Sequence, residues 1–263
     1  MHFSTFDQYV ARQSLIHELD PRLKIVLTIL FIVSNVFLPD GSWWAFGVAW
    51  LAVMGVTTLA RVPWSYILKR SLIAVPFTLA AVTVIFTLPG ETIGSFNLGS
   101  WTFTATDAGL LRFGSIFVRG WLSVQMAFLL TATTQFPDIL HGLRHLRVPS
   151  ILVSIISFMY RYLFVLADEA GRLIRGRAAR SASMQGQKSG RSITWRAKVA
   201  GSMIGQLFIR SMERSDRVYN AMLARGYSGE MLTMNPHKMM GQDWAIGGLF
   251  LILLALIQAI AYL

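Results

Sequence analysis

The sequence contains no cysteine, which excludes disulfide bonds, thiolate metal sites and cysteine nucleophiles. It is also poor in charge, because charged residues make up 14% of its 263 residues, against about 25% in an ordinary soluble protein. Acidic residues are fewer than basic residues, with 13 Asp and Glu against 24 Lys and Arg. So few carboxylates leave little material for a proton or cation path through the chain.

Several catalytic and ligand-binding patterns are missing as well. Segment 186–190 lacks the spacing of a glycine-rich phosphate loop and its following Lys-Ser/Thr pair, so the chain does not bind ATP by that route. The five histidines have no neighbours that complete a Ser-His-Asp set. We therefore predict a protein that is not an enzyme, with no catalytic residue and no cofactor of its own.

Two clusters contain residue types that bind metals. His141 and His145 share one helical face, but no glutamate accompanies them in the zincin pattern, so we expect solvated histidines at the membrane interface. The methionine-rich segment 231–240 suits soft metals in principle, but adaptable packing explains methionine equally well. We predict no metal site.

Apolar residues are abundant, at 54% of the chain, with a mean hydropathy of +0.52 and a formal charge of +11. A nucleic-acid-binding protein is also basic, but it does not expose long apolar runs to water. We therefore predict an integral membrane protein with basic cytoplasmic segments and no nucleic-acid partner. The N-terminus has no basic region followed by an apolar core, so we expect no cleavable signal peptide.

Five apolar segments are long enough, with their flanking turns, to span a bilayer. They are 25–38, 45–60, 71–88, 110–133 and 244–263. Asp20 and Pro21 favour a helix start before the first, Pro76 predicts a bend in the third, and Thr104 with Asp107 has capping-box spacing before the fourth. Segment 151–166 is apolar but short, so it is either a packed helix or a further span.

The distribution of basic residues predicts the topology. Arg22, Lys24, Arg61, Lys69 and Arg70 flank the spans at one side, whereas the connections 39–42 and 89–111 contain no Lys or Arg. Because basic loops remain in the cytoplasm, we expect the N-terminus inside and the C-terminus outside.

Arg112 and Arg119 interrupt the fourth span and lie seven residues apart, on one helical face. An arginine that faces lipid at mid-membrane costs at least about 2.5–3.5 kcal/mol. We therefore expect Arg119 to face protein or a polar cleft.

The segment from 134 to 230 differs in character from the spans. Pro137 and Asp138 start an amphipathic helix that Val148 and Pro149 end, and half of the basic residues, 12 of 24, lie between 172 and 225. A second long helix, from 193 to about 222, has apolar residues on one face and arginines on the other, after a turn or flexible link at 185–192. We expect helix-stabilising ion pairs between Asp168 and Arg172 and between Glu213 and Arg217.

These segments predict three regions. They are an N-terminal membrane portion of four spans (1–133), cytoplasmic amphipathic helices (134–230) and a C-terminal transmembrane helix (231–263). The middle region contains two similar tripeptides, which we call box 1 and box 2. Box 1 is Ala179-Arg180-Ser181, and box 2 is Ala224-Arg225-Gly226.

The boxes and three further motifs follow one another in a characteristic order. The motifs are His17-x-Leu19-Asp20-Pro21-Arg22-x-Lys24, Leu143-Arg144-x-Leu146-Arg147-Val148-Pro149 and Phe158-Met159-Tyr160-Arg161-Tyr162. Together with two boxes whose arginines are 45 residues apart, they resemble the transmembrane T component of energy-coupling factor (ECF) transporters, the cobalt type in particular. The resemblance covers nearly the whole chain. It implies an all-α membrane protein with about five transmembrane helices and long amphipathic cytoplasmic coupling helices.

The resemblance also implies a role and partners. The T component is the energy-coupling subunit of an importer in a prokaryotic plasma membrane, and it transmits the conformational change of two ATP-binding cassette ATPase subunits to a membrane S component that captures the substrate. ATP binds to the ATPase subunits. Each box docks on one ATPase subunit, so the coupling residues are those of the two boxes. They are Ala179, Arg180, Ser181, Ala224, Arg225 and Gly226.

Two questions stay open at this point. The resemblance implies cobalt as the substrate, but nickel or a vitamin would fit the same scaffold. A different class of function is a membrane-anchored adaptor whose basic helices only bind anionic lipid. For that adaptor charge matters rather than position, so Arg→Lys at 180 and 225 would be tolerated.

Overall fold

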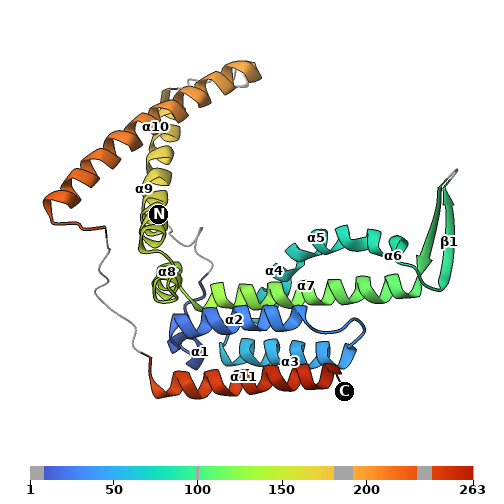
Figure 1. Ribbon diagram of the computed structural model, residues 1–263. Helices are drawn as coiled ribbons and strands as arrows, with labels where there is room; N and C mark the ends of the chain where they lie inside the picture. The colour runs from blue at the N-terminus through green and yellow to red at the C-terminus, as the bar shows by residue number, and fades with distance from the viewer. Residues whose placement is uncertain (1–8, 99–100, 181–191, 230–238, 263) are drawn as a thin grey trace. The chain divides into compact units, whose positions relative to one another are not determined.

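A computed structural model describes residues 9–98, 101–180, 192–229 and 239–262 (Figure 1). The chain divides into two compact units. Residues Met1–Leu146 and Pro236–Leu263 form the first, here called the bundle unit, and Arg147–Asn235 form the second, the arm unit. Apolar helices dominate the structure, which confirms the predicted all-α membrane fold class.

The bundle unit contains nine α-helices within the described residues, two 3₁₀ turns and one β-hairpin. The elements are α1 (Leu15–Glu18), α2 (Pro21–Val36), α3 (Trp43–Leu59), α4 (Trp64–Ser71), η2 (Leu72–Ala74), α5 (Val75–Leu79), η3 (Ala80–Thr83), α6 (Val84–Thr87), β1 (Thr92–Leu98), β2 (Trp101–Thr106), α7 (Asp107–Thr133), α8 (Phe136–His145) and α11 (Gly241–Tyr262). The arm unit consists of α9 (Ser150–Arg180) and α10 (Ile193–Ala224).

The predicted start of α2 is confirmed. The Asp20 side chain accepts a hydrogen bond from the Arg22 backbone N–H at 2.9 Å, and Pro21, which has no N–H to leave unpaired, is the first helical residue. The predicted start of α7 is wrong. Thr104 lies in a β-hairpin opposite Ser95, and Thr106 caps the helix instead by accepting from the Gly109 N–H at 3.2 Å.

The third apolar segment also starts earlier than predicted. The helix begins at Trp64 rather than near residue 71, so the helical segment is Trp64–Thr87. Its α-helical geometry is interrupted by 3₁₀ turns at Leu72–Ala74 and Ala80–Thr83, one on each side of Pro76. Proline removes one backbone N–H and crowds the preceding turn, which explains an irregular helix around the predicted bend.

The predicted count of about five apolar membrane helices agrees with the structure, but the segments that supply it are partly different. Four described helical segments are long and apolar enough to cross a membrane, namely Trp64–Thr87, α7, α9 and α11, and α3 is a shorter apolar helix. Segment 151–166 is therefore the apolar first half of a continuous 31-residue helix, α9. By contrast α2 has only 16 residues, about 24 Å of helix, which is less than the roughly 30 Å of a hydrocarbon core.

Helix α7 is the centre of the bundle unit, because α2, α3 and the Trp64–Thr87 segment all pack against it (Figure 1). It runs antiparallel to α2: Lys24 Nζ donates to the Thr133 carbonyl at 3.3 Å, and Asn35 Nδ2 donates to the Arg119 carbonyl at 2.9 Å. The apolar core between these helices includes Phe31, Val53 and Leu122. Because the surroundings of these helices are lipid, such side chains stabilise the bundle by close van der Waals packing rather than by removal from water.

Helix α11 is parallel to α2, although more than 200 residues separate them in sequence. Gln258 Nε2 donates to the Ser34 carbonyl at 2.6 Å, and the Tyr262 hydroxyl donates to the Phe37 carbonyl at 3.0 Å. Both helices therefore begin at one end of the bundle unit, here called the basic end. Arg22 and Lys24 lie at this end, where Arg61 Nη1 also donates to the Gln13 carbonyl at 3.3 Å.

The predicted protein-facing position of Arg119 is confirmed. Its Nη2 donates to Asp40 Oδ1 at 2.8 Å and also to the Leu38 carbonyl. Arg112, seven residues earlier on the same face of α7, places its Nε 3.9 Å from Asp40 Oδ2. One carboxylate thus joins two arginines of α7 to the turn after α2, which removes the cost of an arginine in lipid.

Gly109 offers a stability test of the contact between α7 and α6. A Cβ at this position would lie 2.6 Å from the Ile85 carbonyl oxygen, whereas a Cβ at Gly47 on α3 would meet open space. We predict that Gly109→Ala destabilises the protein by about 1–3 kcal/mol, because backbone atoms must shift. Gly47→Ala is the matched control and should leave stability unchanged or slightly raised. Thermal unfolding in detergent, followed by tryptophan fluorescence, measures both, and equal curves would contradict the prediction.

Candidate coupling site

Box 1 lies at the C-terminal end of α9. Ala179 and Arg180 are the last two residues of this helix, and both are exposed. Ser181, the third residue of the box, lies outside the described residues. A basic residue at a helix C-terminus is favoured by the helix dipole, so Arg180 occupies an end that its charge stabilises.

Box 2 forms the end of α10 and has a defined backbone geometry. The Gly226 N–H donates to the Leu223 carbonyl at 3.0 Å, and the Tyr227 N–H donates to the Met222 carbonyl at 3.1 Å. These two bonds make a Schellman motif, which needs a left-handed residue just beyond the helix. Gly226 supplies it with a φ of +80°. The glycine of the box therefore stops the helix and leaves the exposed Arg225 at its tip.

Glu169 joins the two helices of the arm unit. Its Oε1 accepts from Arg210 Nη1 on α10 at 2.7 Å, and its Oε2 lies 3.9 Å from Arg214 Nη2. On its own helix Glu169 also accepts from Arg172, so the predicted partner of Arg172, Asp168, is wrong by one residue. This one-residue shift places the carboxylate on the face that meets α10.

Two further contacts describe the helix pair. The predicted pair of Glu213 with Arg217 is confirmed, with 3.9 Å between Oε2 and Nη1. Near the turn between the helices, the Arg177 guanidinium lies 5.9 Å from the centre of the Trp195 ring. This contact brings the end of α9 beside the start of α10.

The boxes consequently lie at opposite ends of α10. Box 1 is within one turn of Arg177, whose partner Trp195 is in the first turn of α10, whereas box 2 ends the same helix. With 32 residues at about 1.5 Å each, α10 is about 48 Å long. The structure does not gather the two arginines into one site but places one at the end of α9 and the other at the far end of α10.

Large apolar side chains remain exposed along both arm helices. On α9 and α10 they are Ile151, Leu152, Ile155, Met159, Leu163, Ile174, Ile193, Trp195, Ile204, Phe208, Ile209, Met212, Tyr219 and Leu223. A contiguous apolar surface of this kind on a helix pair marks a site of contact with protein or membrane.

The N-terminal motif forms a polar cluster at the basic end of the bundle unit. Asp20 and Asp243 are both buried, and Asp243 Oδ1 accepts from the Asp20 N–H at 3.1 Å while its Oδ2 accepts from the Met240 N–H at 2.7 Å. Asp243 thus fixes the start of α11 to the start of α2. Sequence reasoning missed Asp243, although a carboxylate at the edge of an apolar span is costly unless it is paired.

Lys24 and His17 complete this cluster. Lys24 Nζ is buried and donates to the carbonyls of His17 at 2.9 Å and Thr133 at 3.3 Å. The His17 ring contacts Val10 O through Nε2 at 3.0 Å. Burial lowers the pKa of His17 from its usual value, against the raising effect of that hydrogen bond. The cluster therefore connects α1, α2 and the end of α7.

The histidine pair on α8 corrects another expectation. His141 is buried rather than solvated, its ring centre is 4.6 Å from that of His145, and the His145 Nδ1 lies 3.0 Å from the His141 carbonyl. Within the described residues no group of three or more His, Cys, Asp and Glu side chains is placed to hold a metal. The methionine-rich segment 231–240 lies largely outside those residues.

Residues 12–235 match the family model of the cobalt transport protein CbiQ. This match covers most of the chain, including both boxes and the N-terminal motif. The chain belongs to the CbiQ family.

Several curated relatives of this CbiQ-family chain share one name. The "energy-coupling factor transporter transmembrane protein EcfT" of Brevibacillus brevis is 30% identical over 237 residues, which cover 84% of each chain. The protein of the same name from Heliobacterium modesticaldum is 30% identical over 256 residues, or 92% of this chain and 91% of the relative. That of Lacticaseibacillus paracasei is 26% identical over 95% of this chain and 96% of its own. The resemblance to the ECF T component is therefore confirmed.

Glu169 gives a test of the rigidity of the arm unit. We predict that Glu169→Gln broadens the distribution of distances between spin labels on α9 and α10, because the carboxylate that pairs with Arg210 and Arg214 is lost. The absence of native cysteines allows specific labelling at Ile174→Cys and Ile204→Cys, both exposed, with double electron–electron resonance as the measurement. Glu213→Gln is the matched control, since Glu213 pairs with Arg217 on its own helix. Equal distributions in both variants would contradict the role of Glu169.

Proposed function

We propose that this chain is the energy-coupling T subunit of an ECF-type ABC importer. In this role it binds two ATP-binding cassette ATPase subunits through its two boxes and transmits their movement to a membrane S component that captures the substrate. The chain itself carries out no chemical step, and ATP binds to the ATPase subunits. Family membership and the names of the relatives support the assignment.

One structural observation supports the proposal most directly. The exposed Arg180 ends α9 near the start of α10, and the exposed Arg225 lies at the far end of α10, a helix about 48 Å long; this separation suits simultaneous contact with two separate subunits. Arginine offers a planar fork of donors for carboxylates and helix C-termini. Its small neighbours, Ala179, Ala224 and Gly226, allow a helix end to enter a groove on the partner.

The arm unit supplies the means of transmission. Because Glu169 ties α9 to α10, closure of the two ATPase subunits moves the helix pair as one body rather than bending one helix alone. Rigid-body movement of this kind carries force without local unfolding. The exposed apolar face of the two helices is then available to the S component.

For the substrate we propose cobalt. The family's description, cobalt transport protein, supports this choice. The transported ion or molecule is captured by the S component, so the residues of this chain are not expected to coordinate it. Measuring whether the assembled complex takes up cobalt, nickel or a vitamin distinguishes the three candidates.

We further propose that the basic end of the bundle unit faces the cytoplasm of a prokaryotic cell. The exclusion of Lys and Arg from connection 39–42 and the gathering of basic residues at the start of α2 support this orientation. We retain the division into a membrane portion (1–133), a cytoplasmic coupling region (134–230) and a C-terminal span (231–263). The arm unit, Arg147–Asn235, makes up most of this coupling region, whereas α8 belongs to the bundle unit.

Charge reversal at the boxes tests the coupling role. We predict that Arg180→Glu combined with Arg225→Glu abolishes capture of the co-expressed ATPase pair and reduces cobalt uptake to background, because each box then repels the carboxylates it should bind. The matched control is Arg175→Glu combined with Lys198→Glu, which reverses two exposed charges on the same two helices outside the boxes. This control should keep capture and uptake close to those of the wild type.

Three other outcomes separate the alternatives. Normal capture by the double box variant would exclude the boxes as docking points. Equal loss in the control would show that total charge matters rather than position, as for an adaptor that only binds anionic lipid. Such an adaptor would also tolerate Arg→Lys at both positions. If the ATPase subunits instead dock through the planar guanidinium groups, Arg→Lys should remove much of their capture.

Cysteine labelling tests the orientation. We predict that a membrane-impermeant maleimide labels Glu91→Cys in intact cells, because this exposed residue precedes the hairpin at the end opposite Lys24. Lys69→Cys, exposed near the end of α4, should react only after permeabilisation. The native chain has no cysteine, so each signal comes from one position. The reverse pattern would place the basic end outside.

A further inference from the structure

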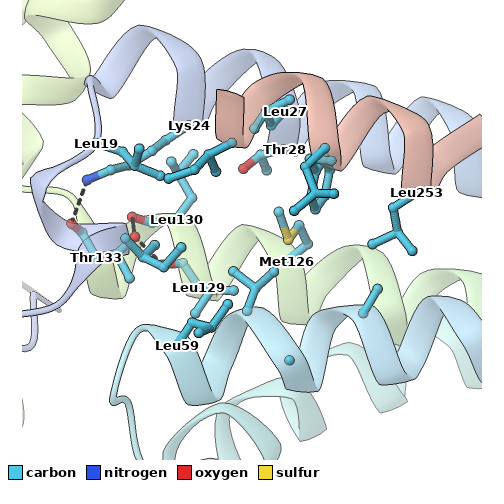
Figure 2. Close-up of a pocket in the computed structure, with 17 residues that line it drawn as sticks. Leu19, Lys24, Leu27, Thr28, Leu59, Met126, Leu129, Leu130, Thr133 and Leu253 are labelled. Atoms are coloured by element: carbon cyan, nitrogen blue, oxygen red, sulfur yellow. Dashed lines mark hydrogen bonds between the residues drawn. The ribbon is translucent and has the colours of Figure 1, made fainter. Parts of the chain in front are cut away.

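The bundle unit contains an apolar cavity of about 260 Å³ beside the polar cluster at its basic end (Figure 2). Helices α2, α3, α7 and α11 form its walls, with Ile16 and Leu19 of the N-terminal segment at one end. Apart from Lys24, Thr28 and Thr133, all lining residues are apolar. Figure 2 shows these side chains converging on a common space from the surrounding helices.

The polar atoms at the end of the cavity are engaged with the protein. Lys24 Nζ donates to the His17 and Thr133 carbonyls, and the Thr133 hydroxyl donates to the Leu129 carbonyl at 2.8 Å. Apart from the Thr28 hydroxyl, the rest of the lining is hydrocarbon, which offers an occupant no hydrogen bonds. A polar substrate would lose its hydration there without compensation, so the surface suits an aliphatic chain.

The cavity has a buried floor and an exposed rim. Met126 and Leu129 of α7 form the floor and are 6% and 2% exposed, whereas Leu59 of α3 and Leu249 of α11 are 58% and 70% exposed. Between these rim residues Gly55 has no side chain, and a Cβ there would meet open space. The cavity therefore opens between α3 and α11 toward the lipid around the bundle.

Its shape suits a single chain. The lining residues extend over seven residue steps on three helices, from Ala52 to Leu59, from Met126 to Thr133 and from Ile246 to Leu253. At about 1.5 Å per step the cavity runs for about 10 Å along the helices. An open apolar cavity at membrane depth is filled by hydrocarbon, because the solvent there is lipid.

The charge beside the opening selects the lipid. Arg61 follows the rim residue Leu59 by two positions and is exposed, with one of its five N–H groups used on the Gln13 carbonyl. Its remaining donors suit a phosphate at the height of the headgroups. Anionic lipids are enriched at the cytoplasmic surface, where the proposed orientation places this end.

We propose that the cavity binds one acyl chain of an anionic phospholipid whose headgroup contacts Arg61. The bound chain fills the space between α3, α7 and α11 and thereby supports the packing of the bundle at the end where the polar cluster lies. This site depends on the membrane placement of the bundle but not on the coupling role of the boxes. The proposal and the function assigned to the boxes can therefore fail separately.

Photo-crosslinking of the full chain tests the site. The protein is placed in nanodiscs of phosphatidylglycerol that carries a diazirine near the end of one acyl chain, and crosslinked peptides are identified by mass spectrometry. We expect crosslinks within 126–133 and 246–253, the segments of α7 and α11 that line the cavity. Their absence from the wild-type protein would overturn the proposal without any variant.

Glycine substitutions provide a matched pair. Gly55→Leu places a side chain into the opening and should reduce these crosslinks several-fold. Gly47→Leu makes the same change on the same helix, also into open space but outside the lining, and should leave them unchanged. Equal crosslinking in the two variants would contradict binding in the cavity.

The headgroup contact has its own test. Arg61→Gln should remove the preference for the phosphatidylglycerol probe over the same probe made from phosphatidylcholine, whereas Lys69→Gln, another exposed basic residue, should retain it. If Arg61→Gln keeps the preference, the headgroup contact is wrong. If phosphatidylcholine already crosslinks equally in the wild type, the cavity is not selective for an anionic lipid.

Discussion

The pairing of polar groups between helices is the constraint on which the bundle unit depends. In a bilayer, packing apolar helices together removes no apolar surface from water, so specific polar contacts decide which helices become neighbours. Here Asn35 joins α2 to α7, Gln258 joins α11 to α2, and Asp243 binds the first turn of α2. These contacts fix the direction of each helix as well as its neighbours.

The arm unit follows a different principle, because the proposed coupling role needs ends that reach partners and a middle that stays stiff. Glu169 provides the stiffness through arginines of α10, and the Schellman motif at Gly226 provides a definite end that exposes Arg225. A single exposed ion pair contributes little to stability, but a carboxylate shared by several arginines restrains the angle between two long helices. Restraint of this angle, rather than added stability, is what transmission of movement requires.

Local features were predicted well from the sequence. The Asp20-Pro21 helix start, the protein-facing Arg119 and the Glu213–Arg217 pair depend on residues close together in the chain or on the cost of charge in lipid. The errors have equally local causes. Thr104 and Thr106 stand three residues and one residue before the first helical residue, Asp107. The hairpin that decides between them depends on pairing with residues 92–98.

The sequence by itself determined the class of the protein, the helical segments, the basic end and the two boxes, because hydropathy, charge and capping are properties of short stretches. Only the tertiary structure decided that Asp243 meets Asp20, that Glu169 rather than Asp168 faces α10, and that a cavity remains between α3, α7 and α11. Contacts between residues up to 225 positions apart depend on how helices pack, and no local pattern encodes that packing.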